Sequence, residues 1–302
     1  MIKEKNKIIV ISGPTASGKT SYSIKLAKEN NGIIINADSM QVYKGLPILS
    51  SQPTIEEREN IEHLLFSVLE PYDNCNVGKW LKMCQEKIEY CFNKGKIPIV
   101  VGGTGMYISK LINGLSQIPE IPSDIRQDVL ELYQNIGYDE FYKIVLDIDK
   151  DYVAKINMND KQRLMRVLEV YKITGKSIQY FINQGNIKLY PDDMFFHINI
   201  NPDRQKLYEK CELRFNKFID EYNALEEISN FKANNQEIIN NPQNYSIFST
   251  IGLKEGIKFL NREITKEEFI EQSIKSTKNY AKRQYTWFNN QFKHFDLRIT
   301  KI

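Results

Sequence analysis

The stretch IIVISGPTASGKTSYSIKLA, residues 8–27, decides the fold of this chain. A run of β-branched residues ends at Gly13, a loop follows, and Lys19 opens an amphipathic helical pattern. The loop matches the pattern G-x-x-x-x-G-K-[ST], with a strand before it and a helix after it. In such a loop, peptide N–H groups, the helix N-terminus and the lysine face an anion, and the Thr20 hydroxyl is the expected Mg²⁺ ligand. The predicted phosphate-binding residues are Gly13, Pro14, Thr15, Ala16, Ser17, Gly18, Lys19 and Thr20.

The composition is that of an ordinary globular protein. The chain has 302 residues, 41% of them hydrophobic and 26% charged, which predicts one large domain with an insertion or two domains. The four cysteines form no C-x-x-C pair and lie away from the three histidines, so we expect neither a disulfide framework nor a structural zinc site. No apolar run is long enough to span a membrane, and the N-terminal segment lacks the apolar core of a signal peptide. We therefore expect a cytoplasmic protein.

The net charge of +3 does not by itself indicate a binding partner, but the distribution of charged residues along the chain is informative. Residues 273–302 hold seven Lys or Arg residues and one acid, and residues 161–176 hold five basic residues and one acid. Acidic residues gather elsewhere, for example in residues 218–228. Separated charge of this kind suits contact with a nucleic acid, although solvated helix faces produce the same pattern.

The first hundred residues alternate between apolar runs and helical patterns. We predict buried strands at Lys7–Ser12, Gly32–Asn36, His63–Leu69 and Ile97–Val101, with helices at 19–30 and 77–94. This alternation indicates a parallel sheet covered by helices, an α/β fold whose functional loops follow the carboxyl ends of the strands. Three loops leave such ends, namely Gly13–Thr20, Ala37–Tyr43 and Gly102–Tyr107.

The pattern changes near Ser116, where a proline-punctuated segment begins. The residues that follow are wholly helical in pattern, most clearly over 160–175, where Gln162 and Arg166 lie one turn apart on one face. A strand returns at 195–200, and the remainder is expected to be helical. We therefore predict a core made of residues 1–115 and 191–302, with a helical insertion at 116–190.

An ordinary nucleotide hydrolase fits this sequence poorly. Such enzymes carry a second acid at the end of an apolar strand to hold Mg²⁺. Here the strand over 97–101 ends in GGTGMY without an acid, and the acid appears earlier, as Asp38 after the second strand. From its position alone, Asp38 is a metal ligand, a general base or the cap of a turn.

Several motifs together resemble one family, the tRNA dimethylallyltransferases. In chain order the similar segments are GPTASGKT (13–20), ADSMQVYKG (37–45), PIVVGGTGMYISKLINGLSQIP (98–119), NDKQRLMRVLEVYKITGKS (159–177) and, more loosely, STIGLKEG (249–256) and AKRQYTWF (281–288). The resemblance implies a P-loop kinase-like fold and transfer of a dimethylallyl group from dimethylallyl diphosphate to N6 of adenosine 37 in tRNA. The loop at 13–20 then holds the diphosphate of an isoprenoid, with Mg²⁺ as cofactor, in a protein that acts as a monomer.

The resemblance also implies roles for individual residues. Asp38 accepts the proton of the amine, Thr104 orients that amine, and Arg126 contacts the diphosphate. The segments that meet the extruded base comprise Asp38, Ser39, Met40 and Gln41, and Gln162, Arg163, Leu164, Met165 and Arg166. The helical insertion is expected to bind the tRNA.

The chain departs from the family pattern at 45–53, 62–66, 75–80 and 253–254, and none of these positions is a proposed catalytic group. Two other functions remain open. One is prenyl transfer to free adenine nucleotides, and the other is a nucleotide-binding RNA module without transfer chemistry. The basic helices favour a tRNA substrate, and an RNA module would tolerate replacement of Asp38.

Overall fold

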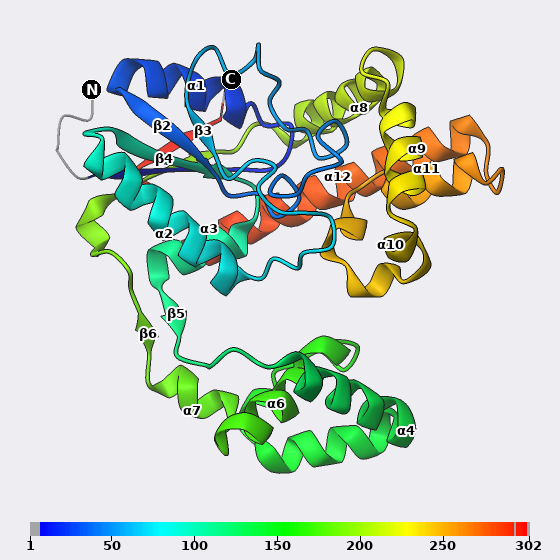
Figure 1. The fold of residues 1–302 in the computed structure, drawn as a ribbon. Coiled ribbons are helices and arrows are strands. Elements are labelled where there is room, and N and C mark those ends of the chain that lie inside the picture. Colours follow the sequence, from blue (N-terminus) through cyan, green and yellow to red (C-terminus); the bar gives the residue numbers. More distant parts are fainter. Residues whose placement is uncertain (1–6, 293, 301–302) are drawn as a thin grey trace. The chain divides into compact units, whose positions relative to one another are not determined.

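The computed structural model describes residues 7–292 and 294–300 (Figure 1). The chain divides into two compact units. The core unit consists of Met1–Ile112 and Leu189–Ile302, and the helical unit consists of Asn113–Lys188. None of the described helices is long and apolar enough to cross a membrane.

A six-stranded parallel sheet forms the centre of the core unit, in the order β3-β2-β4-β1-β7-β8. The strands are β1 (Ile8–Ser12), β2 (Gly32–Asn36), β3 (His63–Leu64), β4 (Ile97–Gly102), β7 (Phe195–Ile200) and β8 (Leu297–Ile299). Strand β1 lies between β4 and β7, and it pairs Val10 with Val100 and with His197. The predicted α/β class with a parallel, P-loop-like core is confirmed.

Helices cover both faces of this sheet, which explains why its strands are continuous apolar runs. In Figure 1, α1 (Lys19–Asn30) lies on one face and α2 (Val77–Asn93) on the other. All five residues of β1 and of β2 are buried. The other helices of the core unit are α3 (Gly105–Asn113), α8 (Arg204–Asp220), α9 (Ala224–Asn234), α10 (Gln236–Asn240), α11 (Leu253–Leu260) and α12 (Lys266–Gln291).

Two secondary-structure predictions, one of a strand and one of helix, were wrong. The strand predicted at 63–69 ends at Leu64, because Leu65 and Ser67 adopt left-handed backbone conformations. The chain then pairs with the loop after β2 instead, and the Val68 amide donates to the Val42 carbonyl. The C-terminal remainder is not wholly helical, because Leu297–Ile299 adds the edge strand β8 beside β7.

The helical unit has its own apolar core. It contains α4 (Ser123–Ile148), α5 (Lys150–Val153), α6 (Lys161–Thr174) and α7 (Ile178–Asn183), with a short antiparallel pair of β5 (Leu115–Ser116) and β6 (Asn186–Ile187). Helix α4 is interrupted at Gly137, whose φ of 76° is left-handed. Phe141 and Val145 of α4 pack with Leu164 and Val167 of α6. These side chains are fully buried, so the unit has a closed core of its own.

A buried histidine lies beneath the phosphate-binding loop and predicts sensitivity to acid. His197 Nε2 is 2.8 Å from Oγ of Ser12, the last residue of β1. Burial lowers the pKa of His197 to about 4, while the nearby Asp296 carboxylate opposes that shift. The unfolded chain, with a His pKa of about 6.5, binds the proton first, so the free energy of unfolding falls as the pH drops from about 6.5 to 4.

The expected loss from this group approaches about 1.4 kcal/mol per pH unit within that window. Urea unfolding of the wild type and of His197→Gln at a series of pH values measures this loss, since the carboxylates other than Asp296 contribute equally to both proteins. We expect the variant to show a shallower slope between pH 6.5 and 4. Equal slopes would contradict the role assigned to His197.

Candidate active site

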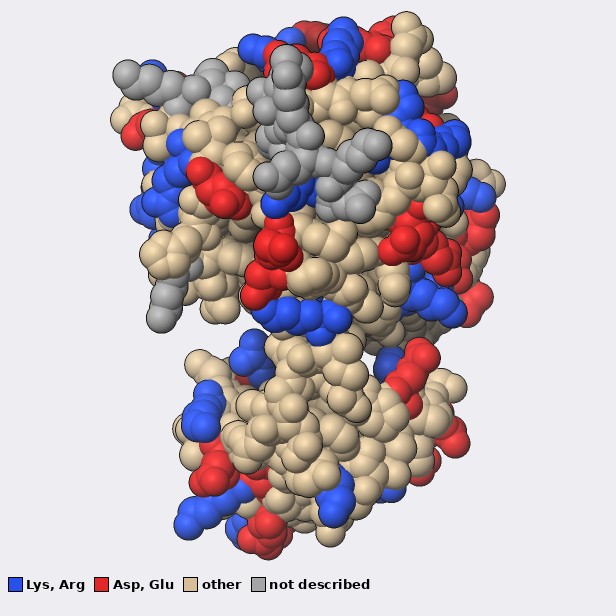
Figure 2. Space-filling model, turned by 90° about the vertical axis from the view of Figure 1, so that its left-hand side faces the viewer, with Lys and Arg blue, Asp and Glu red and all other residues tan. Residues whose placement is uncertain are grey.

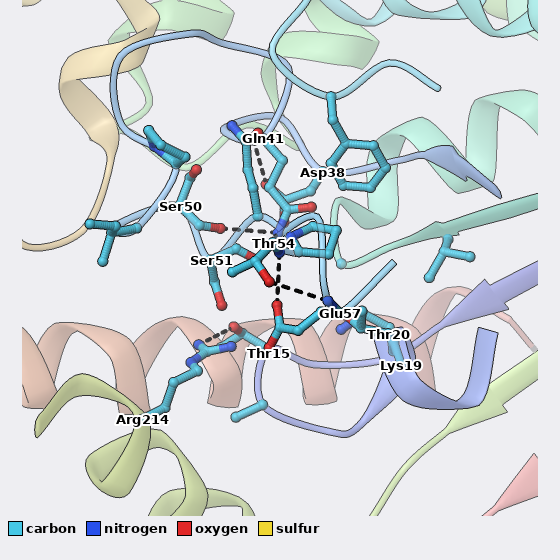
Figure 3. A pocket seen from close by; sticks show the side chains of 18 of the residues that line it. Thr15, Lys19, Thr20, Asp38, Gln41, Ser50, Ser51, Thr54, Glu57 and Arg214 are labelled. Carbon is cyan, nitrogen blue, oxygen red and sulfur yellow. Dashed lines mark hydrogen bonds between the residues drawn. The ribbon is translucent and has the colours of Figure 1, made fainter. Parts of the chain in front are cut away.

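A cavity of about 880 Å³ lies at the carboxyl ends of the central strands. Its walls come from the phosphate-binding loop, the loop after β2, the segment 47–58, the turn after β4 and helix α8. Lys19, Asp38 and Arg214 are among the side chains that line it (Figure 3). Loops that follow β1, β2 and β4 thus meet at one place, as the sequence predicted.

The phosphate-binding loop has the local geometry that its glycines predict. Gly18 has a φ of 87° at the start of α1, which favours a residue without a side chain. A Cβ on Gly13 would lie 2.4 Å from the Ile200 carbonyl oxygen, so the loop passes directly against the end of β7. Lys19 Nζ donates to the Pro14 carbonyl at 2.6 Å, and the exposed Thr20 lines the cavity. The lysine therefore folds back over the loop.

Three ionisable groups influence one another in this cavity. Burial lowers the pKa of Lys19 to about 7, and the Asp38 carboxylate opposes that shift. Burial raises the pKa of Asp38, and hydrogen bonds from backbone amides and the charges of Lys19 and Arg214 oppose that rise. The site is thus a partly desolvated pair of cations beside one carboxylate.

Asp38 combines a structural contact with a free oxygen. Its Oδ1 accepts hydrogen bonds from the Met40 amide at 2.9 Å and the Gln41 amide at 3.4 Å. The structure assigns no hydrogen bond to Oδ2 among the described residues, and Asp38 lines the cavity. The carboxylate therefore caps its own turn and still presents one oxygen to a bound molecule.

The turn after β4 is attached to the loop that carries Asp38. Thr104 Oγ1 accepts a hydrogen bond from the Ser39 amide at 2.9 Å and lies 3.3 Å from Ser39 Oγ. The Thr104 amide donates to the Ala37 carbonyl at 3.2 Å. A Cβ on Gly102 would lie only 2.0 Å from that carbonyl oxygen, so glycine is required for this approach. Thr104 is consequently held beside Asp38.

Two residues that the sequence did not single out hold the phosphate-binding loop. Arg214 on α8 donates from Nη2 to Thr15 Oγ1 at 2.6 Å. Gln284 on α12 accepts a hydrogen bond from the Thr15 amide at 2.8 Å. A sequence signal existed for Gln284, because it lies in AKRQYTWF (281–288), a segment that resembles the family. No signal existed for Arg214, because the pattern of α8 does not distinguish it from the other basic residues of that helix.

A second cavity, of about 250 Å³, borders the same carboxylate. Its lining includes the apolar side chains of Met40, Leu49, Phe215 and Phe218, and Asp38 forms part of its wall. Asp38 therefore borders both the larger space beside the phosphate-binding loop and this smaller one.

The other predicted residues belong to the helical unit. Arg126 is exposed on α4, and Gln162 and Arg163 are exposed on α6. Arg166 pairs with Glu169 at 3.3 Å. Leu164 is fully buried in the core of the unit, so its side chain packs rather than facing a ligand. The roles of these residues toward substrate stay predictions.

Two family models match this chain and identify its class of enzyme. A family model described as IPP transferase matches residues 41–291, and one described as isopentenyl transferase matches residues 6–67. The fold and the site therefore define a P-loop prenyl transferase.

The relatives narrow this class to one family. The tRNA dimethylallyltransferase of Ehrlichia ruminantium is 40% identical over 95% of this chain and 93% of its own length. That of Rickettsia massiliae is 39% identical over 95% of this chain and 78% of its own length. The chain belongs to the tRNA dimethylallyltransferase family.

Solved structures agree with this assignment. A eukaryotic dimethylallyltransferase acting on tRNA matches with a TM-score of 0.82 and 31% identity, over 94% of this chain and 70% of that one. The tRNA isopentenylpyrophosphate transferase from Bacillus halodurans matches with a TM-score of 0.66 and 28% identity, over 99% of this chain and 91% of that one. The predicted family is confirmed.

Proposed function

We propose that this chain transfers a dimethylallyl group from dimethylallyl diphosphate to N6 of adenosine 37 in tRNA and releases diphosphate. The observation that carries the proposal is the pairing of a phosphate-binding loop and two cations with the Asp38 carboxylate around one cavity. The loop and the cations suit a departing anion, and the carboxylate suits the proton that the attacking amine loses.

The leaving group is stabilised by groups that are already in place. As the allylic C–O bond breaks, negative charge develops on the diphosphate, and loop N–H groups, Lys19 and Arg214 face that charge. Preorganised donors of this kind are usually the largest contribution to catalysis. Arg126 is proposed to add a further contact from the helical unit.

A diphosphate-bound Mg²⁺ ion fits the donors of this site. Within residues 7–292 and 294–300, no group of three or more His, Cys, Asp or Glu side chains could hold a metal ion. Mg²⁺ bound through phosphate oxygens and water needs only one or two protein oxygens, and the exposed Thr20 hydroxyl supplies one. Such an ion would neutralise charge on the leaving diphosphate.

The amine is activated by removal of its proton. As the bond between N6 and the allyl carbon forms, the proton passes to Asp38 and the electron pair of the C–O bond leaves with the diphosphate. Burial raises the pKa of Asp38, which strengthens it as a base. Thr104, held beside Asp38 through Ser39, orients the amine.

RNA recognition is proposed to use both units. Ser39, Met40 and Gln41 follow Asp38 in the core unit, and Gln162, Arg163, Met165 and Arg166 lie on α6 of the helical unit. On the face in Figure 2, basic and acidic side chains are interspersed over each unit, so this face offers no continuous basic field. Base contacts, rather than charge alone, are expected to select the loop.

One experiment tests the proposed function directly. The protein is incubated with Mg²⁺, dimethylallyl diphosphate and an anticodon stem-loop RNA with adenosines at positions 36, 37 and 38, and the RNA is digested and analysed by mass spectrometry. We expect one dimethylallyl group on adenosine 37, and none on a matched RNA with guanosine there. Transfer to free AMP instead would favour the small-molecule alternative, and rapid ATP hydrolysis without a prenyl donor would contradict the proposal.

The pKa of Lys19 predicts a pH dependence for donor binding. An ammonium group with a pKa of about 7 is half deprotonated at that pH, and a bound diphosphate raises its pKa. Binding therefore takes up a proton above pH 7, and affinity for dimethylallyl diphosphate falls by up to about tenfold per unit as the pH rises toward 9. Calorimetry in buffers of different ionisation enthalpy measures that uptake.

Lys19→Arg is the control for this prediction, because a guanidinium keeps its proton throughout the range. We expect the variant to bind the donor without proton uptake. The same uptake in wild type and variant would assign the titration to another group.

A further inference from the structure

Gln284 makes two hydrogen bonds to two loops that lie far apart in the sequence. Its side chain is buried on α12, with an exposed fraction of 5%. The Oε1 atom accepts from the Thr15 amide at 2.8 Å, and the Nε2 atom donates to the Gly103 carbonyl at 2.8 Å. One side-chain amide thus joins the phosphate-binding loop to the turn after β4.

The turn is shaped for this contact. A Cβ on Gly103 would lie 2.2 Å from Gln284 Nε2, and a Cβ on Gly105 would lie 2.2 Å from Trp287 Cε3. Helix α12 therefore lies directly against the backbone of the turn, which leaves no space for a side chain at Gly103 or Gly105. The close approach lets Gln284, two turns before the end of α12, reach both loops.

The two loops carry different parts of the proposed reaction. Thr15 belongs to the cradle of the leaving group, where its hydroxyl also accepts from Arg214 at 2.6 Å. Gly103 precedes Thr104, which contacts the Ser39 amide beside Asp38 at 2.9 Å. Because the Thr15 amide is already used by Gln284, that amide orients the loop rather than the diphosphate.

We propose that Gln284 is a positioning residue that holds the diphosphate cradle and the Thr104 turn in register, so that leaving group and amine are aligned. The inference rests on the proposed function. Misplacement of reacting groups raises the activation barrier of transfer more than it weakens substrate binding. We therefore expect Gln284 to affect the rate of transfer more than the binding of either substrate.

An amide is suited to this task because it accepts and donates at once. Gln284→Glu keeps an acceptor for the Thr15 amide and, when ionised, loses the donor to Gly103. Gln284→Met keeps nearly the same shape and loses both bonds. Gln272→Met, on an exposed site of the same helix, is the matched control.

The test compares these variants with the wild type in two measurements. Single-turnover transfer is followed at saturating dimethylallyl diphosphate and stem-loop RNA, alongside titrations of inorganic diphosphate and of the RNA. Hydrogen exchange of residues 13–18 and 102–105 reports the coupling without any need for activity. Thermal unfolding shows which variants fold. If Gln284→Met does not fold, the comparison of Gln284→Glu with the wild type tests the positioning role.

We expect Gln284→Met to lower the saturated rate at least about tenfold more than it weakens either binding equilibrium, with Gln284→Glu in between. Exchange is expected to rise in both loops together, while Gln272→Met matches the wild type. A rate loss no larger than the binding loss, or faster exchange in only one loop, would overturn the inference. If exchange rises in both loops of the Gln284 variants but the wild type transfers no dimethylallyl group, the coupling stands and the proposed function is removed.

Discussion

Replacing Asp38 by asparagine is expected to lower the rate of dimethylallyl transfer by at least about 10²-fold, because the amide cannot accept the proton of the amine. The Asn side-chain oxygen still accepts the bonds that Asp38 Oδ1 receives from the Met40 and Gln41 amides, so the turn keeps its shape. Stem-loop binding should stay within about threefold of the wild type. Single-turnover transfer and a binding titration of the RNA measure the two effects.

Asp73→Asn provides the matched control. Asp73 also caps a turn, since its Oδ2 accepts from the Glu70 amide at 2.9 Å, but it lies outside both cavities. Its replacement should leave transfer unchanged. Near-normal turnover in Asp38→Asn would remove Asp38 from the role of base and would favour an RNA module whose Asp38 only caps the turn.

The second large effect is expected at Arg214. Arg214→Met removes a cation that faces the leaving group and the 2.6 Å bond to Thr15 Oγ1. Loss of one preorganised donor to a developing anion typically costs about 10²–10³-fold in rate. We expect a loss of that size in kcat/KM for dimethylallyl diphosphate, and a smaller one for Arg214→Lys, which keeps the charge but not the planar fork.

Lys210→Met tests whether charge alone explains this effect. Lys210 lies one turn before Arg214 on α8 and also lines the larger cavity, but its side chain is exposed. Screening by solvent should limit its effect to about threefold. Equal losses for the two variants, measured under identical salt, would show that Arg214 acts through the general field and not through its contact with the loop.

The parts of the site that could be predicted are those with local signals. The phosphate-binding loop follows from its glycines and from the strand and helix on either side. The loops that carry Asp38 and Thr104 were found because parallel strands bring their carboxyl ends to one edge, and Thr104 itself was singled out only by the family resemblance. The structure places the two loops in contact. The strand predicted at 63–69 was wrong beyond Leu64, because Leu65 and Ser67 adopt left-handed conformations and the chain then pairs with the loop after β2, a long-range contact.

Arg214 and Gln284 show the opposite case. Each lies on a helix whose pattern reveals an apolar face but not which polar side chain points toward a distant loop. Arg214 is 199 residues from its partner Thr15 in sequence, and Gln284 is 269 residues from it. The sequence by itself determined the glycine-rich loop at 13–20, the parallel sheet and the family, because these depend on local backbone preferences and on contiguous motifs. Only the tertiary structure decided which side chains hold that loop in place, because packing of α8 and α12 selects them, and the burial that tunes Lys19 and Asp38 exists only once the chain is folded.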